Sequence, residues 1–356
     1  MSPTRFSRTA TALLALATLF AGACAKSERQ AGPTDHATSF TVTDDVGREI
    51  TFDAPVTTAV VFNSYNSDAI ISLGKRDAIV AVDEVTRSRL EFAFTKDDVI
   101  GPDFAELNYE HIIELNPDVV ILPRNGVWEE ASSKLEQFDI PVLVATVWDP
   151  SKWNSNIDLL SRVFDAPERS AEILEFTDGI RDLVADRVKD ADRPVVYYED
   201  DPYVSANKEN ARTFSIQAAG GKNMFSEVTQ AGGAAGLGAE VDPVDVLTAQ
   251  PQVIFKEIGT AYDGSSIADF EAARTELLDR SGWHDLPAVE DDKVFVYNAW
   301  AQELAGRTFQ QLYFAKWIHP ELFEDVDPAH YVNTWLTEYL KGPEYTGDEH
   351  YVLSGV

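Results

Sequence analysis

The sequence predicts an α/β protein built from two similar lobes, and three observations support this prediction. The segment from Leu107 to Leu122 is a short helical pattern, then a proline, then an apolar run, and the segment from Val241 to Phe255 repeats that order. Strand-like runs alternate with helical patterns along the chain, which favours largely parallel sheets. A long helical pattern from Pro167 separates the two repeats. Because any α/β protein contains several helix-proline-strand units, the repeat is also compatible with a single sheet.

Each repeated unit predicts a helix that a proline ends and a strand that is buried on both faces. In the first unit Pro117 stops the helix, and residues 118–122, which are apolar after Asp118, form the expected strand. In the second unit Pro251 precedes the run 253–255. Two lobes built in this way leave a cleft between them, and clefts bind small molecules.

The other elements follow from the same patterns. Residues 40–52 predict a hairpin that turns at 45–47. Strands are expected over 58–62, 77–82, 140–144, 194–198 and 293–297, a loop over 63–66, and helices over 67–73, from about 213 to 219 and over 308–318. Pro167 and Glu168 suit the first turn of a connecting helix that ends near Asp190. The tail from Lys341 to Val356 contains Gly, Pro and charge, and we expect it to pack loosely.

Length, composition and charge limit the function. The 356 residues suffice for two domains, and a hydrophobic content of 44% allows a substantial core. The formal net charge of -31 makes nucleic acid a poor partner, because phosphate binding requires clustered Lys and Arg. An anionic ligand would have to be bound by local arginines against the field of the whole protein.

The residues that usually mark catalysis or metal binding are scarce. The single cysteine excludes a disulfide within the chain and a cysteine-based zinc or iron-sulfur site. The six histidines form no HExxH motif, and neither GxSxG nor a Walker A spacing is present. We therefore expect no enzyme activity, no catalytic residue, no metal site and no resident cofactor.

The N-terminus predicts an export signal that ends at a cysteine. Arg5 and Arg8 precede an apolar run, and small residues lead into Cys24. This resembles a bacterial lipobox, with Ala21 where leucine is most frequent, and it predicts a signal peptide over 1–23 and lipidation of Cys24. An ordinary secretory signal with a chance cysteine is the alternative. Residues 24–38 are then a flexible tether.

Seven segments in a fixed order resemble one family. They are VTDDVGREITFDAPV, SDAIISLGKRDAIVAV, LNYEHIIELNPDVVIL, IQAAGGKNMF, LTAQPQVIF, SGWHDLPAVEDDKVFVYN and HPELFEDVDP, and they span about Thr41 to Pro328. The chain resembles the substrate-binding lipoproteins of ABC importers of the iron-siderophore, haem and vitamin B12 type, the class III periplasmic binding proteins.

The resemblance implies a fold and a division of the chain. It implies two Rossmann-like lobes with largely parallel sheets, joined by one long helix that permits limited hinge motion. The divisions are an N-terminal lobe over 39–165, an inter-lobe helix over 166–192, a C-terminal lobe over 193–342 and a tail over 343–356. The ligand would lie between the lobes at the carboxyl ends of the strands.

The resemblance also implies a docking surface with one acidic side chain on each lobe for an ABC permease. On the first lobe the matching residue is Glu110, in a helix that Asn108 can cap. On the second lobe Val244 takes the place of the usual glutamate, with Asp242 and Asp245 beside it. Each of these acidic residues also suits a helix N-terminus without any docking role.

The loops that follow the strands supply the candidate ligand contacts. Arginine donates planar, charge-assisted hydrogen bonds to carboxylate or catecholate oxygens, and Trp and Tyr give flat apolar area with a polar edge. Each of these residues could instead have a structural role. The candidates are Tyr65, Arg87, Arg124, Trp128, Trp148, Tyr203, Tyr262, Trp300 and Arg307.

These residue types favour a ferric siderophore, delivered by a monomeric, lipid-anchored extracytoplasmic protein to an ABC permease. Haem, cobalamin and a molybdate-like oxyanion are the alternatives within the same transporter class. His111, His284 and His319 are poorly placed to ligate haem iron, whereas a tyrosine ligand stays open. A cell-surface hydrolase with paired carboxylates, or an adhesion lipoprotein, are the alternatives from other classes.

Overall fold

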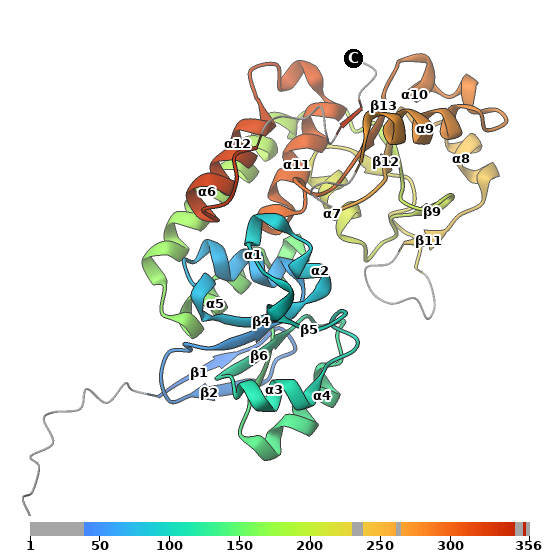
Figure 1. Cartoon of the computed structure of the whole chain (residues 1–356). Helices are drawn as coiled ribbons and strands as arrows, with labels where there is room; N and C mark the ends of the chain where they lie inside the picture. Colours follow the sequence, from blue (N-terminus) through green and yellow to red (C-terminus); the bar gives the residue numbers. More distant parts are fainter. Residues whose placement is uncertain (1–38, 230–237, 261–264, 346–351, 354–356) are drawn as a thin grey trace, which may run out of the picture. The chain divides into compact units, whose positions relative to one another are not determined.

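The computed structural model describes residues 39–229, 238–260 and 265–345, together with the backbone of a short strand at 352–353. Cys24, the predicted signal peptide and tether, and Tyr262 lie outside these ranges. In the part of the chain that is described, no helix is long and apolar enough to cross a membrane. The α/β prediction is confirmed, because two lobes with largely parallel sheets are joined by one long helix (Figure 1).

The N-terminal lobe has a parallel five-stranded sheet in the order β5-β4-β3-β6-β7. Its strands are β3 (Ala59–Val61), β4 (Ile79–Asp83), β5 (Val99–Gly101), β6 (Val119–Leu122) and β7 (Val142–Val144). Its helices are α1 (Ser64–Ser72), α2 (Glu84–Arg87), α3 (Tyr109–Leu115), α4 (Trp128–Leu135) and α5 (Trp153–Phe164). The predicted hairpin is the antiparallel pair β1 (Phe40–Thr43) and β2 (Glu49–Phe52).

The C-terminal lobe has a five-stranded sheet in the order β10-β8-β12-β13-β14, in which only β14 runs antiparallel. Its strands are β8 (Val195–Glu199), β10 (Lys222–Asn223), β12 (Val253–Glu257), β13 (Val294–Tyr297) and β14 (Val352–Leu353). β9 (Val204–Ser205) pairs separately with β11 (Ala239–Glu240). Its helices are α7 (Ala211–Ala218), α8 (Pro243–Ala249), α9 (Ile267–Leu278), α10 (Pro287–Glu290), α11 (Leu304–Ile318) and α12 (Pro328–Thr334).

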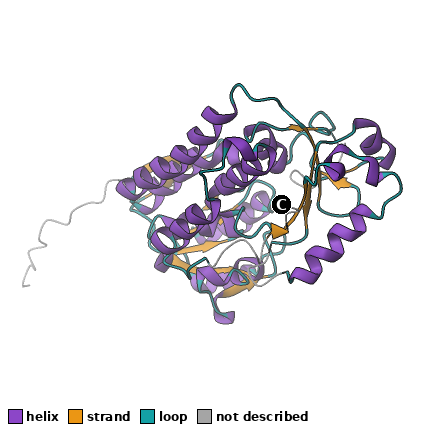
Figure 2. Ribbon diagram, turned by 90° about the horizontal axis from the view of Figure 1, so that it is seen from above, coloured by secondary structure: helices purple, strands orange, loops and turns teal. Residues whose placement is uncertain are grey.

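Short turns complete the described part. The 3₁₀ turns are Arg76–Ala78, Leu90–Phe92, Lys96–Asp98, Glu136–Phe138, Pro150–Lys152, Trp283–Asp285 and Pro320–Leu322, and a π turn spans Trp335–Tyr339. In the view of Figure 2 helices flank the strands of both lobes. Because the strands within each lobe are mostly parallel, their carboxyl ends share one edge of each sheet.

The connecting helix α6 (Pro167–Val188) begins with proline, which suits the first helical position because its missing N–H would be unpaired there anyway. It packs against α5 of the first lobe and α11 of the second. Ile173, Ile180 and Val184 are buried on one face, in the same core as α11. One apolar core thus continues along this helix from one lobe to the other.

Two local expectations need correction, and a third is confirmed. The loop expected over 63–66 is wrong, because the side chain of Asn63 accepts the N–H of Tyr65 and starts α1 at Ser64. The helix expected over 308–318 has the predicted start, because residues 305–307 at the beginning of α11 have left-handed backbone angles and regular helical geometry begins at Thr308. The expectation of a loosely packed tail is wrong at Tyr345, which is buried against the ring of Trp300. The strand β14 also pairs with β13.

Candidate functional site

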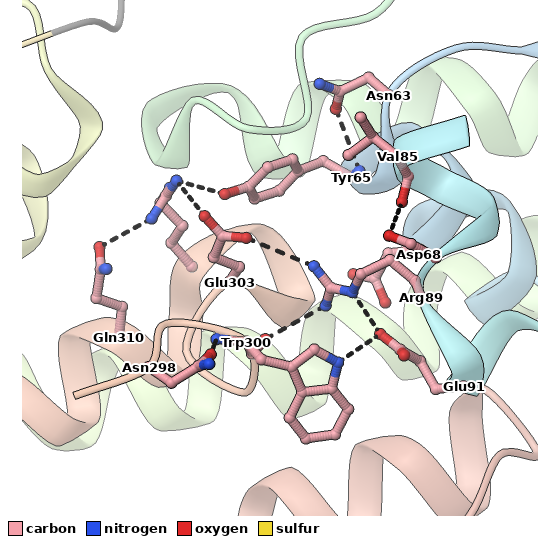
Figure 3. A network of polar contacts seen from close by, with 12 residues as sticks. Asn63, Tyr65, Asp68, Val85, Arg89, Glu91, Asn298, Trp300, Glu303 and Gln310 are labelled. Atoms are coloured by element: carbon pink, nitrogen blue, oxygen red, sulfur yellow. Dashed lines mark hydrogen bonds and ion pairs between the residues drawn. The ribbon is translucent and has the colours of Figure 1, made fainter. Parts of the chain in front are cut away.

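A buried network of charged and aromatic side chains lies between the lobes, where the strands of both sheets end (Figure 3). The N-terminal lobe contributes α1, which follows β3, and the segment around Arg89, which follows β4. The C-terminal lobe contributes Glu257 at the end of β12 and the segment 298–307 after β13. This is the edge at which open α/β sheets bind ligands.

Three arginines form the cationic part of this network. Arg89 of the first lobe donates to Glu91 at 2.7 Å and to the Trp300 carbonyl of the second lobe at 3.3 Å. Arg307 of the second lobe donates to the Tyr65 hydroxyl of the first. Arg212 lies in the first turn of α7 and forms an ion pair with Glu257. Polar contacts therefore cross between the lobes in both directions.

The carboxylate of Glu257 is enclosed by donors. The hydroxyls of Tyr198 and Tyr297 donate to it at 2.9 and 3.0 Å, and the Nε of Arg212 donates at 3.2 Å. Burial alone would raise the pKa of Glu257, but the charge and hydrogen bonds of Arg212 lower it below its ordinary value. Glu257 is therefore an anion that holds Arg212 in place.

Asp68 has the opposite environment. It accepts hydrogen bonds from the indole of Trp335 and the N–H of Ala305, both at 2.9 Å. Burial raises its pKa to about 7, although these two hydrogen bonds lower it in part. Asp68 joins α1 of the first lobe to the start of α11 and to the π turn that follows α12.

The segment that carries Arg307 has an unusual backbone. Ala305, Gly306 and Arg307 have φ values of 49°, 58° and 64°, three consecutive left-handed residues. A side chain on Gly306 would lie 2.3 Å from Cε3 of Trp153, so only glycine fits. Left-handed non-glycine residues cost about 1–3 kcal/mol each and gather at functional sites.

Several buried polar atoms around the network have no hydrogen-bond partner among the described residues. Buried polar groups are normally satisfied, so such a group of atoms marks a place where polar ligand atoms can bind. Those contributed by α1, the segment around Arg89, the segment 298–307 and the next turn of α11 are Asn66 Oδ1, Ser67 Oγ, Glu91 Oε2, Arg307 Nε, Gln302 Nε2 and Oε1, Gln310 Nε2 and Gln311 Nε2.

A groove of about 440 Å³ also has walls from both lobes. Arg124 and Trp148 come from loops after β6 and β7, with the guanidinium 4.7 Å from the ring centroid and paired with Asp149 at 2.8 Å. Lys208 and Phe214 form part of the opposite wall. A larger hollow of about 1090 Å³ is lined by the first lobe alone, by residues such as Asp118 and Pro141 that precede strands. It therefore lies at the amino ends of the strands, where open sheets do not bind.

Comparison with known proteins identifies the family. The periplasmic binding protein family matches residues 60–300. The chain belongs to this family. It is 22% identical to the molybdate-binding protein MolA of Haemophilus influenzae, over 84% of this chain and 90% of the relative. It is also 22% identical to the vitamin B12-binding protein of Vibrio campbellii, over 73% and 88%.

Solved structures of the family share the fold. The TroA-like periplasmic binding protein FepB from Veillonella parvula superposes with a TM-score of 0.71 at 21% identity, covering 88% of this chain and 99% of that one. The molybdate-bound form of Haemophilus influenzae MolA gives a TM-score of 0.69 at 20% identity, covering 86% and 99%. The two-lobe architecture is thus that of periplasmic binding proteins.

The structure brings five of the predicted ligand residues to the inter-lobe region of this family member. Tyr65, Trp300 and Arg307 belong to the buried network, and Trp300 donates its indole N–H to Glu91 at 3.0 Å. Arg124 and Trp148 line the groove.

The structure places three others elsewhere. Arg87 pairs with Glu84 inside α2. Trp128 packs in the first lobe beneath Arg48, and Tyr203 packs against Trp283 in the second. Tyr262 lies outside the described residues.

The network also contains residues that the sequence prediction missed. Asp68, Glu91, Glu257 and Glu303 were not among the candidates. Glu257 gives one signal that could have been used, because two charged residues, Lys256 and Glu257, directly follow the apolar run 253–255. Glu303 and Arg307, four positions apart, look like an ordinary helical ion pair in sequence.

The predicted docking residues lie on the two repeated units. Asn108 caps α3 by accepting the N–H of His111, and Glu110 is exposed in the first turn. Asp242 caps α8 by accepting the N–H of Val244. Asp245 is exposed in the first turn of that helix. The caps are structural facts, and docking remains a separate proposal.

Proposed function

We propose that this chain is an extracytoplasmic solute-binding protein that captures a ferric siderophore between its lobes and delivers it to an ABC permease. It changes no covalent bond of its solute. Delivery follows from differential binding, since the loaded form with its lobes closed would fit the permease better than the open form. In this proposal Cys24 is lipidated and anchors the protein to the membrane.

The main support is that arginines from both lobes meet in one buried network. Arginine suits the carboxylate, catecholate or hydroxamate oxygens of an iron chelate, because its fork of donors binds two acceptors at once. The rings of Tyr65 and Trp300 give flat apolar area beside them. Arg124 and Trp148 would contact the outer part of a bulky solute in the groove.

A molybdate-like oxyanion is the second candidate. The similarity to a relative named as molybdate-binding extends over most of both chains, and oxyanions also bind arginine and unpaired polar side chains. An oxyanion would need only the buried network. A siderophore would also need the groove, so the two ligands make different demands on Trp148.

The test is native mass spectrometry of the mature protein against a panel. The panel contains ferric hydroxamate and catecholate siderophores, molybdate, haem and cyanocobalamin. We expect a one-to-one complex with a ferric siderophore, accompanied by quenching of tryptophan fluorescence. Binding of molybdate alone would favour the second candidate, and binding of haem or cobalamin alone would refute both. Trp148→Ala should weaken a siderophore about tenfold and leave molybdate unchanged.

Docking is tested separately from binding. Glu110→Lys reverses a charge that the permease would have to meet with a cation, so solute uptake should fall sharply while solute affinity stays within twofold. Asp245→Lys should act in the same way on the second lobe. Uptake that is unchanged in both variants would remove these residues from the docking surface.

A further inference from the structure

One carboxylate in the inter-lobe network contacts all three arginines. Glu303 lies 3.0 Å from Arg307, 3.5 Å from Arg89 and 3.7 Å from Arg212, measured between nitrogen and oxygen. Its side chain is about 8% exposed. Arg89 comes from the first lobe and the other two from the second. Glu303 therefore sits where an anionic group bound by both lobes would sit.

The three arginines depend on Glu303 to different degrees. Arg89 has its own carboxylate in Glu91, and Arg212 has its own in Glu257. For Arg307, Glu303 is the single carboxylate within 4.0 Å in the described ranges. If the Glu303 side chain moved away, one guanidinium would lose its counter-charge and the other two would keep theirs.

The contacts of Glu303 and Arg307 are incomplete. The Nε of Arg307 has no partner among the described residues, and neither has the Nε2 of the neighbouring Gln310. Arg307 donates to the Oε1 of Gln310 at 3.4 Å, which is a long hydrogen bond. Glu303 also stands just before the three left-handed residues 305–307, a segment whose backbone stores strain. A strained, incompletely bonded contact is suited to exchange.

We infer that Glu303 is a built-in substitute for the solute, and that the bound solute replaces its carboxylate on Arg307 with an anionic group of its own. This inference rests on the proposed function and adds a condition on the ligand. Because Arg89 and Arg212 keep their own glutamates, the site exchanges one negative charge. It selects a solute that presents a single anionic group to this network, and it binds polyanions poorly.

The exchange lowers the apparent affinity of the wild type. A self-bound form that is populated tenfold over the free form weakens solute binding by about the same factor. In return, the arginines are never left unpaired when the protein is empty, and an uncompensated buried charge would be costly. Glu303 thus sets how tightly a solute must bind Arg307 in order to displace the carboxylate.

The first experiment needs no solute. Glu303→Ala removes the carboxylate and leaves room for acetate beside Arg307. Acetate should raise the Tm of this variant in a saturable way, at constant ionic strength against chloride, and leave the wild type unchanged. Glu276→Ala is the matched control, since it removes an exposed carboxylate from Arg280 in the same lobe. Equal acetate responses in the three proteins would overturn the inference.

A second variant covers the case in which Glu303→Ala does not fold. Glu303→Gln keeps the shape and removes the charge, and acetate should shift its Tm more than that of the wild type. The same variant should bind a ferric hydroxamate siderophore that carries one free carboxylate about tenfold more tightly than the wild type does. Weaker binding by Glu303→Gln would show that Glu303 contacts the solute rather than competing with it.

The two proposals can fail separately. The first case is that no protein binds an iron chelate but acetate stabilises only the Glu303 variants. The proposal of a ferric siderophore as the solute is then wrong, and the role of Glu303 as a substitute anion on Arg307 is supported. If the wild type binds a ferric siderophore and acetate distinguishes none of the variants, the function stands and the role of Glu303 is wrong.

Discussion

Glu199 and Glu303 are two of the buried glutamates in the C-terminal lobe that have arginine partners, and they differ in how completely they are satisfied. Glu199 ends β8 and is fully buried. It accepts from both terminal nitrogens of Arg280 at 2.7 and 2.9 Å, and from Lys256 at 3.1 Å. The hydroxyl of Tyr197 and the N–H of Tyr203 complete its bonds at 2.6 and 2.9 Å. All of these donors belong to one lobe.

Glu303 has the same chemistry in a different setting. Its three arginine contacts range from 3.0 to 3.7 Å and come from both lobes, and they lie among polar atoms that have no hydrogen-bond partner in the described part of the chain. A complete network inside one lobe stabilises the fold, whereas an incomplete network between lobes can exchange its partners. Burial and charge alone therefore do not identify a binding site, and completeness and location distinguish the two cases.

The largest effect is expected on stability at Glu199. Glu199→Ala leaves Lys256 and Arg280 without their buried counter-charge, so the free energy of unfolding should fall by about 3–5 kcal/mol. Urea unfolding followed by circular dichroism measures this change. Glu276→Ala removes the exposed partner of the same Arg280 and should cost about 1 kcal/mol or less. Equal losses would show that the two carboxylates are equivalent.

A smaller effect is expected in the strained segment of the inter-lobe network. Gly306→Ala would place a methyl group against Trp153 at a left-handed position, and it should cost roughly 1–3 kcal/mol of unfolding free energy. Gly179→Ala, in the exposed middle of α6 with no atom near the added methyl, should instead stabilise by about 0.5–1 kcal/mol. Thermal unfolding of both variants decides whether 305–307 is held as tightly as the structure indicates.

The next comparison concerns two arginines and separates binding from stability. Arg307→Met should weaken the solute identified by the panel by about tenfold or more, because a charge-assisted hydrogen bond contributes about 1.5–3 kcal/mol. Arg280→Met should leave affinity within twofold and lower the Tm. Titration calorimetry well below both melting temperatures tests this. If Arg307→Met and Arg280→Met lowered the affinity and the Tm to the same extent, the two networks would not differ in role.

Much of the architecture was predictable because its signals are local. Pro117 and Pro251 mark the ends of helices in both repeated units, and the apolar runs after them are central strands in both sheets. The cap at Asn108 was visible for the same reason, since a cap acts on residues two or three positions away. Periodicity and capping need no knowledge of the other lobe.

The binding network was less predictable because its contacts span the chain. Tyr65 and Arg307 are 242 positions apart, and Arg89 and Glu303 are 214 apart. Arg307 was a candidate because it follows a strand. The left-handed turn at 305–307 directs its side chain toward Tyr65, and no periodic pattern in the sequence predicts such a turn. Arg87 and Arg89 look alike in sequence, yet one pairs inside α2 and the other crosses between lobes.

The smallest effect contrasts the pH response of the two regions. Burial raises the pKa of Asp68 to about 7, well above the ordinary value near 4 of an unfolded chain, and Arg89 and Glu91 have smaller opposing influences. The stability that Asp68 contributes is therefore present in full below pH 4 and is lost as pH rises through 7. Glu199 has a lowered pKa, held down mainly by Arg280 against the effect of burial, so its contribution is lost as pH falls.

In the Asp68→Asn variant the side chain at position 68 does not titrate. The difference in unfolding free energy between the wild type and this variant therefore reports the titration of Asp68 alone. Between pH 6 and pH 7 the unfolding free energy of the wild type should fall by roughly 1 kcal/mol relative to that of the variant. Urea unfolding of both proteins at pH 5, 6, 7 and 8 gives the difference curve, in which the titration of groups common to the two proteins cancels. A flat curve would mean that Asp68 is already ionised at pH 5. The N–H of Ala305 and the indole of Trp335 would then hold a permanent charge between the lobes, and the inter-lobe network would resemble the complete Glu199 network more than its unpaired atoms suggest.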